Sequence, residues 1–252
     1  MHILISNDDG IFSPGIRILA SAAVKRGHRV TVSAPATQQS AMSHRLTLNQ
    51  SMMAKPYELA GARAFAVDGS PVDCVRLGRY LAEDEPIDFC LSGINDGTNL
   101  GTALYYSGTA AAAREAAMLN IPSMALSIGV RATEEMIENL ADFALDLLPH
   151  FKERTMPRLS FLNINAEAIP PDQLKGARLC PISDSFFMDR YVQRVNPRGV
   201  PYFWIEAGAQ TEAVKPGTDI DLCEQGYITC TFVGGFTDNN HLFEGMLGTR
   251  ED

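Results

Sequence analysis

Apolar residues recur along the first half of the chain in two alternating patterns. Short apolar runs of strand length alternate with longer segments of helical period. For example, the apolar run at residues 2–6 is followed by a segment of helical period at residues 14–26. This alternation is typical of βαβ units, in which consecutive strands run parallel and are connected by helices. We therefore expect an α/β fold with a mostly parallel sheet. The predicted strands are 2–6, 29–33, 63–67, 87–92, 123–127 and 159–163, and the predicted helices are 14–26, 71–81, 110–119 and 134–148.

The pattern changes after about residue 165. Prolines there separate short β-prone segments, including Tyr202–Ile205 and Tyr227–Phe232. Such a pattern indicates hairpins and loops rather than further βαβ units. We expect residues 1–165 to form the core and residues 166–252 to form a hairpin and loop extension of the same domain, used for oligomerisation.

Composition narrows the classes of function. The chain has 46% hydrophobic and 20% charged residues, which is ordinary for a globular protein with a large core. Its formal net charge is −9 and it has no Lys/Arg run, so binding to a nucleic-acid duplex is disfavoured. No apolar run reaches the roughly 18 residues of a membrane span, and we expect no signal peptide.

The number and spacing of the cysteines indicate the redox state of the cellular compartment. The five cysteines are odd in number and contain no CxxC spacing. A disulfide framework or a zinc site is therefore disfavoured, and a reducing cytoplasm fits best. We expect each cysteine to act as a small buried apolar residue.

Two adjacent carboxylates, Asp8 and Asp9, follow the first predicted strand directly. In open α/β sheets the ligand crevice lies at the carboxyl ends of the strands. Neighbouring carboxylates repel each other, and a divalent cation with hard oxygen ligands offsets this repulsion. Asp-Asp-Gly also occurs in plain turns, so this pair alone leaves both interpretations open.

Three further loops should lie on the same rim of the sheet. The loop after the second strand offers the Ser40 hydroxyl and the His44 imidazole, and a glycine-rich loop after strand 87–92 offers Asn95 and Asn99. Ser107–Thr109 precedes an alanine-rich helix, where free backbone N–H groups favour an anion. Each feature also has a simple structural interpretation as a turn, a glycine-rich connection or an N-cap.

Taken together, a carboxylate pair, neutral oxygen ligands and an anion-binding helix start predict a metal beside a phosphate. Metal-assisted hydrolysis of a phosphate ester requires this combination. The metal polarises a phosphoryl oxygen and supplies hydroxide at neutral pH, while the helix end stabilises the developing charge. The expected route is in-line attack by water without a covalent intermediate, with Asp9 also orienting that water.

At these residues the sequence resembles the SurE family of metal-dependent 5′-nucleotidases. The opening signature is Ser6–Gly10 with Ser13–Gly15, and the match is strongest in the two glycine-containing loops after strand 87–92. The motifs that carry the resemblance occur in order up to about residue 231: Ala34-Pro35 with Ser40, Gly69–Cys74, Ser92–Asn95, Asn99–Gly101, Tyr106–Thr109, Asn196–Gly199, Tyr202–Trp204, Pro216–Asp219 and Gly226-Tyr227.

The resemblance implies a Rossmann-like three-layer core and one divalent ion per subunit, Mg²⁺ or Mn²⁺. It implies hydrolysis of nucleoside 5′-monophosphates in the cytoplasm, by a dimer or tetramer that exchanges C-terminal elements. Cleavage of 3′-nucleotides or polyphosphate stays open. The residues implied to hold the metal are Asp8, Asp9, Ser40 and Asn95. Those we expect to bind the phosphoryl group are Asn99, Ser107, Gly108 and Thr109.

The sequence departs from the family pattern at several positions. Ala36 and Thr102-Ala103 occupy positions that are often acidic, and Ala41 follows Ser40 where glycine is common. The tail from residue 233 does not align cleanly, so the Asp/His pair of some members has no assured counterpart here. His44 and His241 are the candidates for the general acid.

Two other classes of protein remain as alternatives. A signalling receiver module also carries an acidic pair after its first strand, but Asp68 is far from Asp8 for a phospho-acceptor. Strand 123–127 is not followed by the lysine that a receiver needs. A family member without catalysis, serving as a metal-binding scaffold, is the second alternative. The absence of a DxD motif in the first loop disfavours a haloacid-dehalogenase mechanism.

Overall fold

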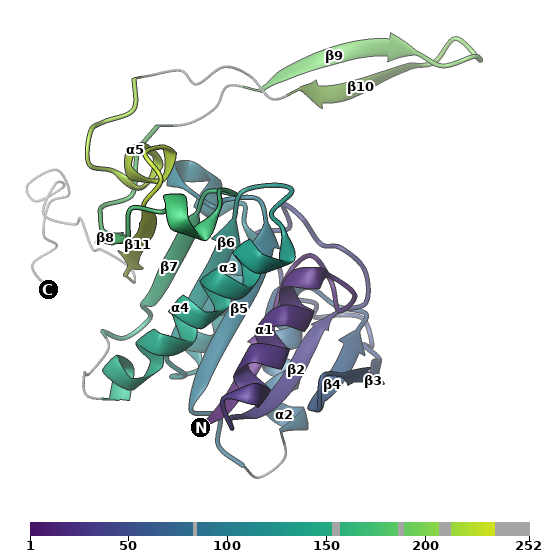
Figure 1. Cartoon of the computed structure of the whole chain (residues 1–252). Helices are drawn as coiled ribbons and strands as arrows, with labels where there is room; N and C mark the ends of the chain where they lie inside the picture. The colour runs from purple at the N-terminus through teal and green to yellow at the C-terminus, as the bar shows by residue number, and fades with distance from the viewer. Residues whose placement is uncertain (83–84, 153–156, 186–188, 207–212, 235–252) are drawn as a thin grey trace, which may run out of the picture.

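The computed structural model describes residues 1–82, 85–152, 157–185, 189–206 and 213–234. Its centre is a nine-stranded sheet with helices on both faces, so the chain forms three layers (Figure 1). The strands of this sheet are β1 (His2–Ser6), β2 (Arg29–Pro35), β3 (Ala54–Leu59), β4 (Ala62–Val67), β5 (Phe89–Asp96), β6 (Ser123–Ile128), β7 (Phe161–Ala166), β8 (Ala177–Leu179) and β11 (Ile228–Val233). Their order across the sheet is β3-β4-β2-β1-β5-β6-β7-β11-β8.

The expectation of a mostly parallel α/β sheet is confirmed. β1 pairs in parallel with both β2 and β5, and the parallel pairing continues outward to β4 and to β7. All five residues of β1 are buried, as expected for a strand covered on both faces. The pairings of β3 with β4 and of β11 with β7 are antiparallel.

Four longer helices cover the sheet. α1 (Pro14–Lys25) packs beside α4 (Glu134–Lys152) on one face, and α2 (Pro71–Leu81) packs beside α3 (Gly108–Met118) on the other. α2 begins with a capping box, in which the Ser70 hydroxyl accepts from the Asp73 N–H and the Asp73 carboxylate accepts from the Ser70 N–H. The remaining short helices are η1 (Gly101–Tyr105), η2 (Pro171–Gln173) and α5 (Asp219–Glu224).

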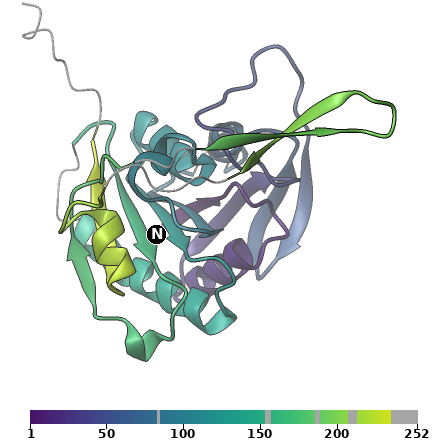
Figure 2. The ribbon, with the colours of Figure 1, turned by 90° about the horizontal axis from the view of Figure 1, so that it is seen from above.

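A hairpin projects from this body. β9 (Arg190–Val195) and β10 (Pro201–Glu206) pair only with each other and extend beyond the helices (Figures 1 and 2). Large apolar side chains on the hairpin face solvent, and Phe203 and Trp204 are each 60% exposed. The extension predicted after residue 165 therefore contains a hairpin, although α5, β8 and β11 of the same stretch belong to the body (Figure 1).

Several elements differ from the sequence prediction. β3 was not expected, because its segment contains Pro56 and charged residues, a composition tolerated at a sheet edge. β5 does not end at residue 92 but continues to Asp96, and α4 continues past Pro149 to Lys152. The short helix α5 was also not expected.

All five cysteines are free thiols, and four of them are buried as expected. Cys180 is the partly exposed one. Complete burial raises the pKa of the Cys90 thiol to about 12, so this thiol stays protonated and packs as an apolar group.

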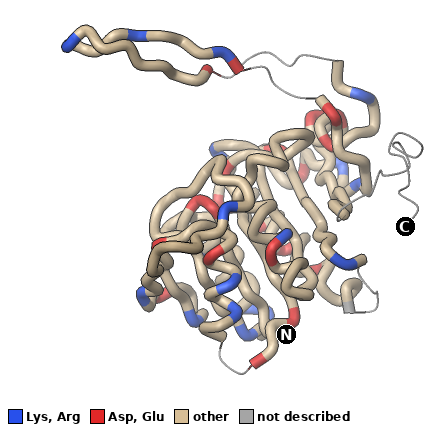
Figure 3. Tube along the Cα trace, turned by 180° about the vertical axis from the view of Figure 1, so that it is seen from behind, with Lys and Arg blue, Asp and Glu red and all other residues tan. Residues whose placement is uncertain are grey.

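Charged residues are spread over the described surface rather than divided by sign. Lys and Arg segments lie among Asp and Glu segments along the trace, including on the hairpin (Figure 3). No helix in the described part of the chain has the length and apolar character needed to cross a bilayer.

Candidate functional site

The turn after β1 presents Asp8 and Asp9 at the carboxyl end of the central strands. Asn7 shapes this turn, because its Nδ2 donates to the Gly10 carbonyl and its Oδ1 accepts from the Gly10 N–H. Gly10 has a φ of +95°, a conformation that glycine adopts without strain. Asn7 also donates to the Ser13 hydroxyl, which ties the turn to the start of α1.

Asp8 is buried against the start of α3. Its Oδ1 accepts a 2.5 Å hydrogen bond from the Thr109 hydroxyl. Burial raises the pKa of Asp8, while hydrogen bonds from Thr109 and Gly108 oppose that rise. A Cβ on Gly108 would lie 2.7 Å from the Asp8 Cβ, so only glycine allows this close approach. The start of α3 therefore directs its donors at the first carboxylate.

Asp9 is less buried and faces a different set of groups. Its Oδ2 accepts from the Asp96 N–H at 3.0 Å, and its Oδ1 lies 3.4 Å from the Gln38 side-chain nitrogen. The pKa of Asp9 is raised, mainly by burial and further by the negative charges of Asp8 and Asp96. Ionising either carboxyl group therefore costs free energy in the folded protein.

Ser40 joins the pair through Gln38. The Gln38 side-chain nitrogen donates to the Ser40 hydroxyl at 3.0 Å while it also faces Asp9. The loop that carries Ser40 is held at two places: the Gln39 N–H donates to the Asp8 carbonyl at 2.7 Å, and Ser43 bonds to carbonyls at the end of η1. The predicted meeting of the β2 loop with the β1 turn is therefore present.

Asn95 lies within β5 rather than in the loop where we expected it. The pairing of β5 with β6 shifts register between Ser92 and Asn95, and Asn95 then pairs with Ser127. Its Nδ2 donates to the Gly97 carbonyl at 2.6 Å, which leaves Oδ1 as the atom that can face a ligand. The strand end also places Asp96 next to Asp9.

The residues predicted to bind phosphate occupy two neighbouring segments. Ser107 caps α3, with its hydroxyl accepting from the Ala110 N–H, and it precedes Gly108 and Thr109 beside Asp8. Asn99 is buried in a different network, in which its Nδ2 donates to Ser127 and its N–H donates to Asn165. Asn99 therefore anchors the loop after β5 in this structure.

His44 contacts a buried carboxylate that our sequence analysis did not single out. Its Nε2 lies 2.8 Å from Glu115 of α3, and the other oxygen of Glu115 lies 3.0 Å from Arg76 of α2. The Glu115 side chain is only 4% exposed. One signal was available, since Glu115 shares a face of an alanine-rich helix with Ala111 and Ala112. His241 lies outside the described residues.

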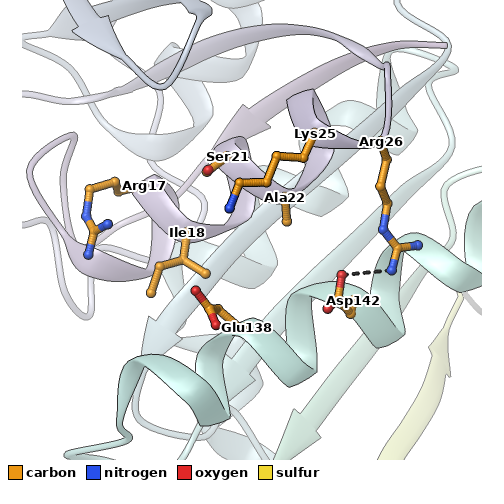
Figure 4. A pocket seen from close by; sticks show the side chains of 8 residues that line it. All are labelled: Arg17, Ile18, Ser21, Ala22, Lys25, Arg26, Glu138 and Asp142. Atoms are coloured by element: carbon orange, nitrogen blue, oxygen red, sulfur yellow. Dashed lines mark hydrogen bonds and ion pairs between the residues drawn. The ribbon is translucent and has the colours of Figure 1, made fainter.

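A cavity of about 320 Å³ opens beside Asp9. It lies between the start of α1, the ends of β5 and β6, and the start of α4. A second cavity, of about 290 Å³, lies farther along the groove between α1 and α4 and has paired charges on its walls (Figure 4). Arg26 there binds Asp142 and Asp146, while Arg17 binds Glu134. Only the first of these two cavities borders the carboxylate pair.

The donor set around Asp9 fits a hard divalent cation. Two carboxylates, a hydroxyl and an amide oxygen are ligands that Mg²⁺ and Mn²⁺ accept. Ser40 and Asp9 already share one electropositive donor, the Gln38 nitrogen. Among the described residues, no three His, Cys, Asp or Glu side chains gather as a metal cluster. A cation bound here would take its remaining ligands from neutral oxygens.

Comparison with known proteins identifies the family of this chain. The sequence profile of the family described as "Survival protein SurE" matches residues 3–189. This chain belongs to the SurE family. A SurE relative from Nitratidesulfovibrio vulgaris (strain DP4), named 5′-nucleotidase SurE, is 40% identical over 96% of this chain and 97% of its own length.

Two further SurE proteins extend the match. The 5′-nucleotidase SurE of Thermosipho africanus (strain TCF52B) is 36% identical over 100% of this chain and 98% of its own length. The crystal structure of the SurE protein from Aquifex aeolicus superimposes with a TM-score of 0.82, at 32% identity and 98% coverage of both chains. The resemblance to SurE that the motifs carry is thus confirmed.

Proposed function

We propose that this protein is a divalent-metal-dependent phosphatase that hydrolyses nucleoside 5′-monophosphates to nucleoside and phosphate. The observation that carries the proposal is the meeting of Asp8 and Asp9 with neutral oxygens beside the start of α3. Membership of the SurE family supports the substrate class, because the relatives that cover nearly the whole chain are named 5′-nucleotidases.

The residues that would hold one divalent ion, Mg²⁺ or Mn²⁺, are Asp8, Asp9, Ser40 and Asn95. When bound, such an ion polarises a phosphoryl oxygen and lowers the pKa of water. The surrounding residues keep the ligands oriented. Thr109 holds one oxygen of Asp8, Gln38 holds Ser40, and the backbone of Asp96 holds one oxygen of Asp9.

The start of α3 would bind the phosphoryl group. Ser107 is the N-cap of this helix and Gly108 and Thr109 are its first residues, where the helix dipole favours negative charge. Gly108 and Thr109 already donate to Asp8, so the phosphoryl group would share these donors with that carboxylate. Asn99 already donates to Ser127 and Asn165, so it would contribute only through the second hydrogen of its side-chain amide. These groups are fixed by the fold before substrate arrives, so they stabilise charge that develops on the phosphoryl oxygens during hydrolysis. Asp9 would also orient the attacking water.

The proton for the leaving group has two candidate sources, His44 and His241. The Nε2 of His44 is already engaged by Glu115, which supports a second role for His44 in holding the Ser40 loop against α3. We assign no more to either histidine.

We further propose that the protein acts as a dimer or tetramer in the cytoplasm. The apolar hairpin of β9 and β10 supports the assembly, since an isolated two-stranded hairpin is marginally stable in water. The chain would be one domain in which residues 166–252 extend the core of residues 1–165 and exchange between subunits. The pairing of β11 with β7 supports this continuity.

The first test is release of phosphate from 5′-AMP and 5′-GMP with Mn²⁺ or Mg²⁺ and with EDTA. We expect activity with metal, loss of activity with EDTA, and a loss of at least about 100-fold in Asp8→Ala, because that variant removes a charged ligand. The matched control is Asp142→Ala, which removes an exposed aspartate far from the site. Activity that survives chelation or the Asp8 substitution would refute the proposal, and metal binding without any phosphate release would favour a scaffold.

A further inference from the structure

The cavity beside Asp9 has the size and the walls of a small-ligand site. Its volume of about 320 Å³ lies at the lower end of the range for ligand pockets, roughly 300–1,000 Å³. Asp9 and Gln38 form one side of it, so a molecule in the cavity would lie directly next to the proposed metal ligands.

Apolar side chains from four elements line one part of the cavity, and the polar residues Ser13, Asp96 and Glu134 line another. Pro14 comes from the start of α1, Ile94 from β5, Ile128 from the end of β6 and Ile137 from α4. Gly15 allows α1 to approach closely, because a Cβ there would lie 1.9 Å from the Ile94 carbonyl oxygen. Walls that combine apolar side chains with a few polar groups suit a flat ligand with polar edges, such as a nucleobase.

Arg131 lines the cavity, and its guanidinium makes no ion pair within the described part of the chain. Its backbone is fixed by a 3.0 Å hydrogen bond from its N–H to Asp96, whose own N–H holds Asp9. Arg131 also has a φ of 64°, an uncommon conformation for a non-glycine residue and one that concentrates at functional sites. Asp96 therefore positions the backbone of Arg131 and the carboxylate of Asp9 together.

We infer that this cavity binds the nucleoside of the substrate and that Arg131 reads its base. The inference rests on the proposed function. The apolar walls enclose the base, and the guanidinium donates to acceptors on its edge. Arginine pairs best with the O6 and N7 acceptors of guanine, so nucleotides with a 6-oxopurine base are preferred over those with adenine.

The test compares esters with and without a nucleoside, using the Mn²⁺-loaded enzyme. We expect Arg131→Met to raise KM for 5′-GMP about tenfold, to raise KM for 5′-AMP less, and to leave kcat for both unchanged. Hydrolysis of p-nitrophenyl phosphate, which has no nucleoside, should be unaffected. The control variant Arg26→Met removes an arginine of the neighbouring groove and should change none of these values.

Equal losses on 5′-GMP and p-nitrophenyl phosphate would overturn the inference, because they would show damage to the metal site. An Arg131→Met enzyme with wild-type KM for 5′-GMP would also overturn it. Calorimetric titration with guanosine separates this inference from the proposed function. If the wild-type protein hydrolysed neither ester, the proposed function would be refuted. In that case, weaker guanosine binding by Arg131→Met than by the wild type would still support the nucleoside site. Equal guanosine affinity would refute it.

Discussion

Asp8 and Asp9 are neighbours in the chain, yet the fold gives their carboxyl groups different surroundings. Asp8 is buried against Thr109, whereas Asp9 faces Gln38 and the backbone of Asp96. Burial raises the pKa of both side chains, so ionising either one costs more free energy in the folded protein than in the unfolded chain. A divalent ion would relieve this cost, which links metal binding to stability.

This raised pKa predicts that Asp9→Asn stabilises the metal-free protein. A carboxyl group whose native pKa is raised is disfavoured when ionised. The fold therefore loses stability as the pH rises from the ordinary value of 3.8 through the native pKa. With EDTA at pH 7, the variant should melt a few degrees higher than the wild type.

Thermal denaturation followed by circular dichroism measures this difference, and the gap should narrow as the pH is lowered toward 4. The control Asp142→Asn removes an exposed ion pair with Arg26 and should not raise the melting temperature at pH 7. A lower melting temperature for Asp9→Asn at pH 7 would contradict the argument.

At the residue scale the sequence indicates the proposed ligands, but it does not indicate the residues that orient them. The position of Asp8 and Asp9 after an apolar run is enough to indicate a site, because parallel strands end at a ligand crevice. Gln38 and Asp96 gave no signal, since polar residues in loops usually face solvent. Their contacts depend on how β1, β2 and β5 lie side by side, which no local pattern records.

Among the elements, β5 and α3 do most to build the site. The register shift in β5 sets Asn95 and Asp96 at the strand end, and such bulges often redirect side chains near active sites. The start of α3 lies against Asp8 because residue 108 is glycine. Backbone geometry therefore decides where the proposed ligands and the phosphate-binding groups meet.

The tight contact at residue 108 gives a prediction for Gly108→Ala. The new Cβ would lie 2.7 Å from the Asp8 Cβ, so α3 or the β1 turn must shift. A displacement of about 1 Å at a catalytic centre can cost about 100-fold in rate, and we expect kcat/KM for 5′-AMP to fall by that order. Steady-state phosphate release measures it.

Gly234→Ala is the matched control, because no atom of the residues that the structure describes lies within 4 Å of a Cβ at that position. The control should keep wild-type activity. If Gly108→Ala kept it as well, the start of α3 would not constrain Asp8 in the way that the structure indicates.

The bounds of helices and strands could be predicted where the apolar residues recur with a clear helical or strand period. They could not be predicted where polar residues interrupt that period. β1, α1 and α2 match the prediction closely, since each has a buried apolar face and α1 and α2 start at a proline. β9 was not predicted, because its exposed residues include Arg190 and Arg194 and its partner strand is needed to define it.

For the molecule as a whole, the notable feature is the projecting hairpin, whose two strands make no pairing with the main sheet. Phe203 and Trp204 stay exposed in one chain, and monomeric proteins seldom leave such apolar groups together at the surface. A second copy of the chain is the partner that our proposal assigns to the hairpin.

The variant Trp204→Asp should therefore weaken assembly. An ionised carboxylate in an apolar contact between subunits is costly, so the mean mass should shift toward the monomer. Light scattering coupled to size-exclusion chromatography gives the mass of wild type and variant at equal concentration. Tyr80→Asp, an exposed aromatic residue on α2, is the control and should not change the mass. A Trp204→Asp protein that stays fully assembled would show that the hairpin does not hold the subunits together.

The place of β11 in the sheet has a consequence for how the chain is made. The ribosome delivers β1 to β7 before β11, although β11 is the strand that pairs with β7. Until residues 228–233 emerge, β7 exposes an unpaired edge with Phe161 and Leu162, a template for pairing with other newly made chains. The proposed ligands, all within the first 109 residues, are translated well before that edge can close, so the edge of β7 stays open to such pairing until β11 is made.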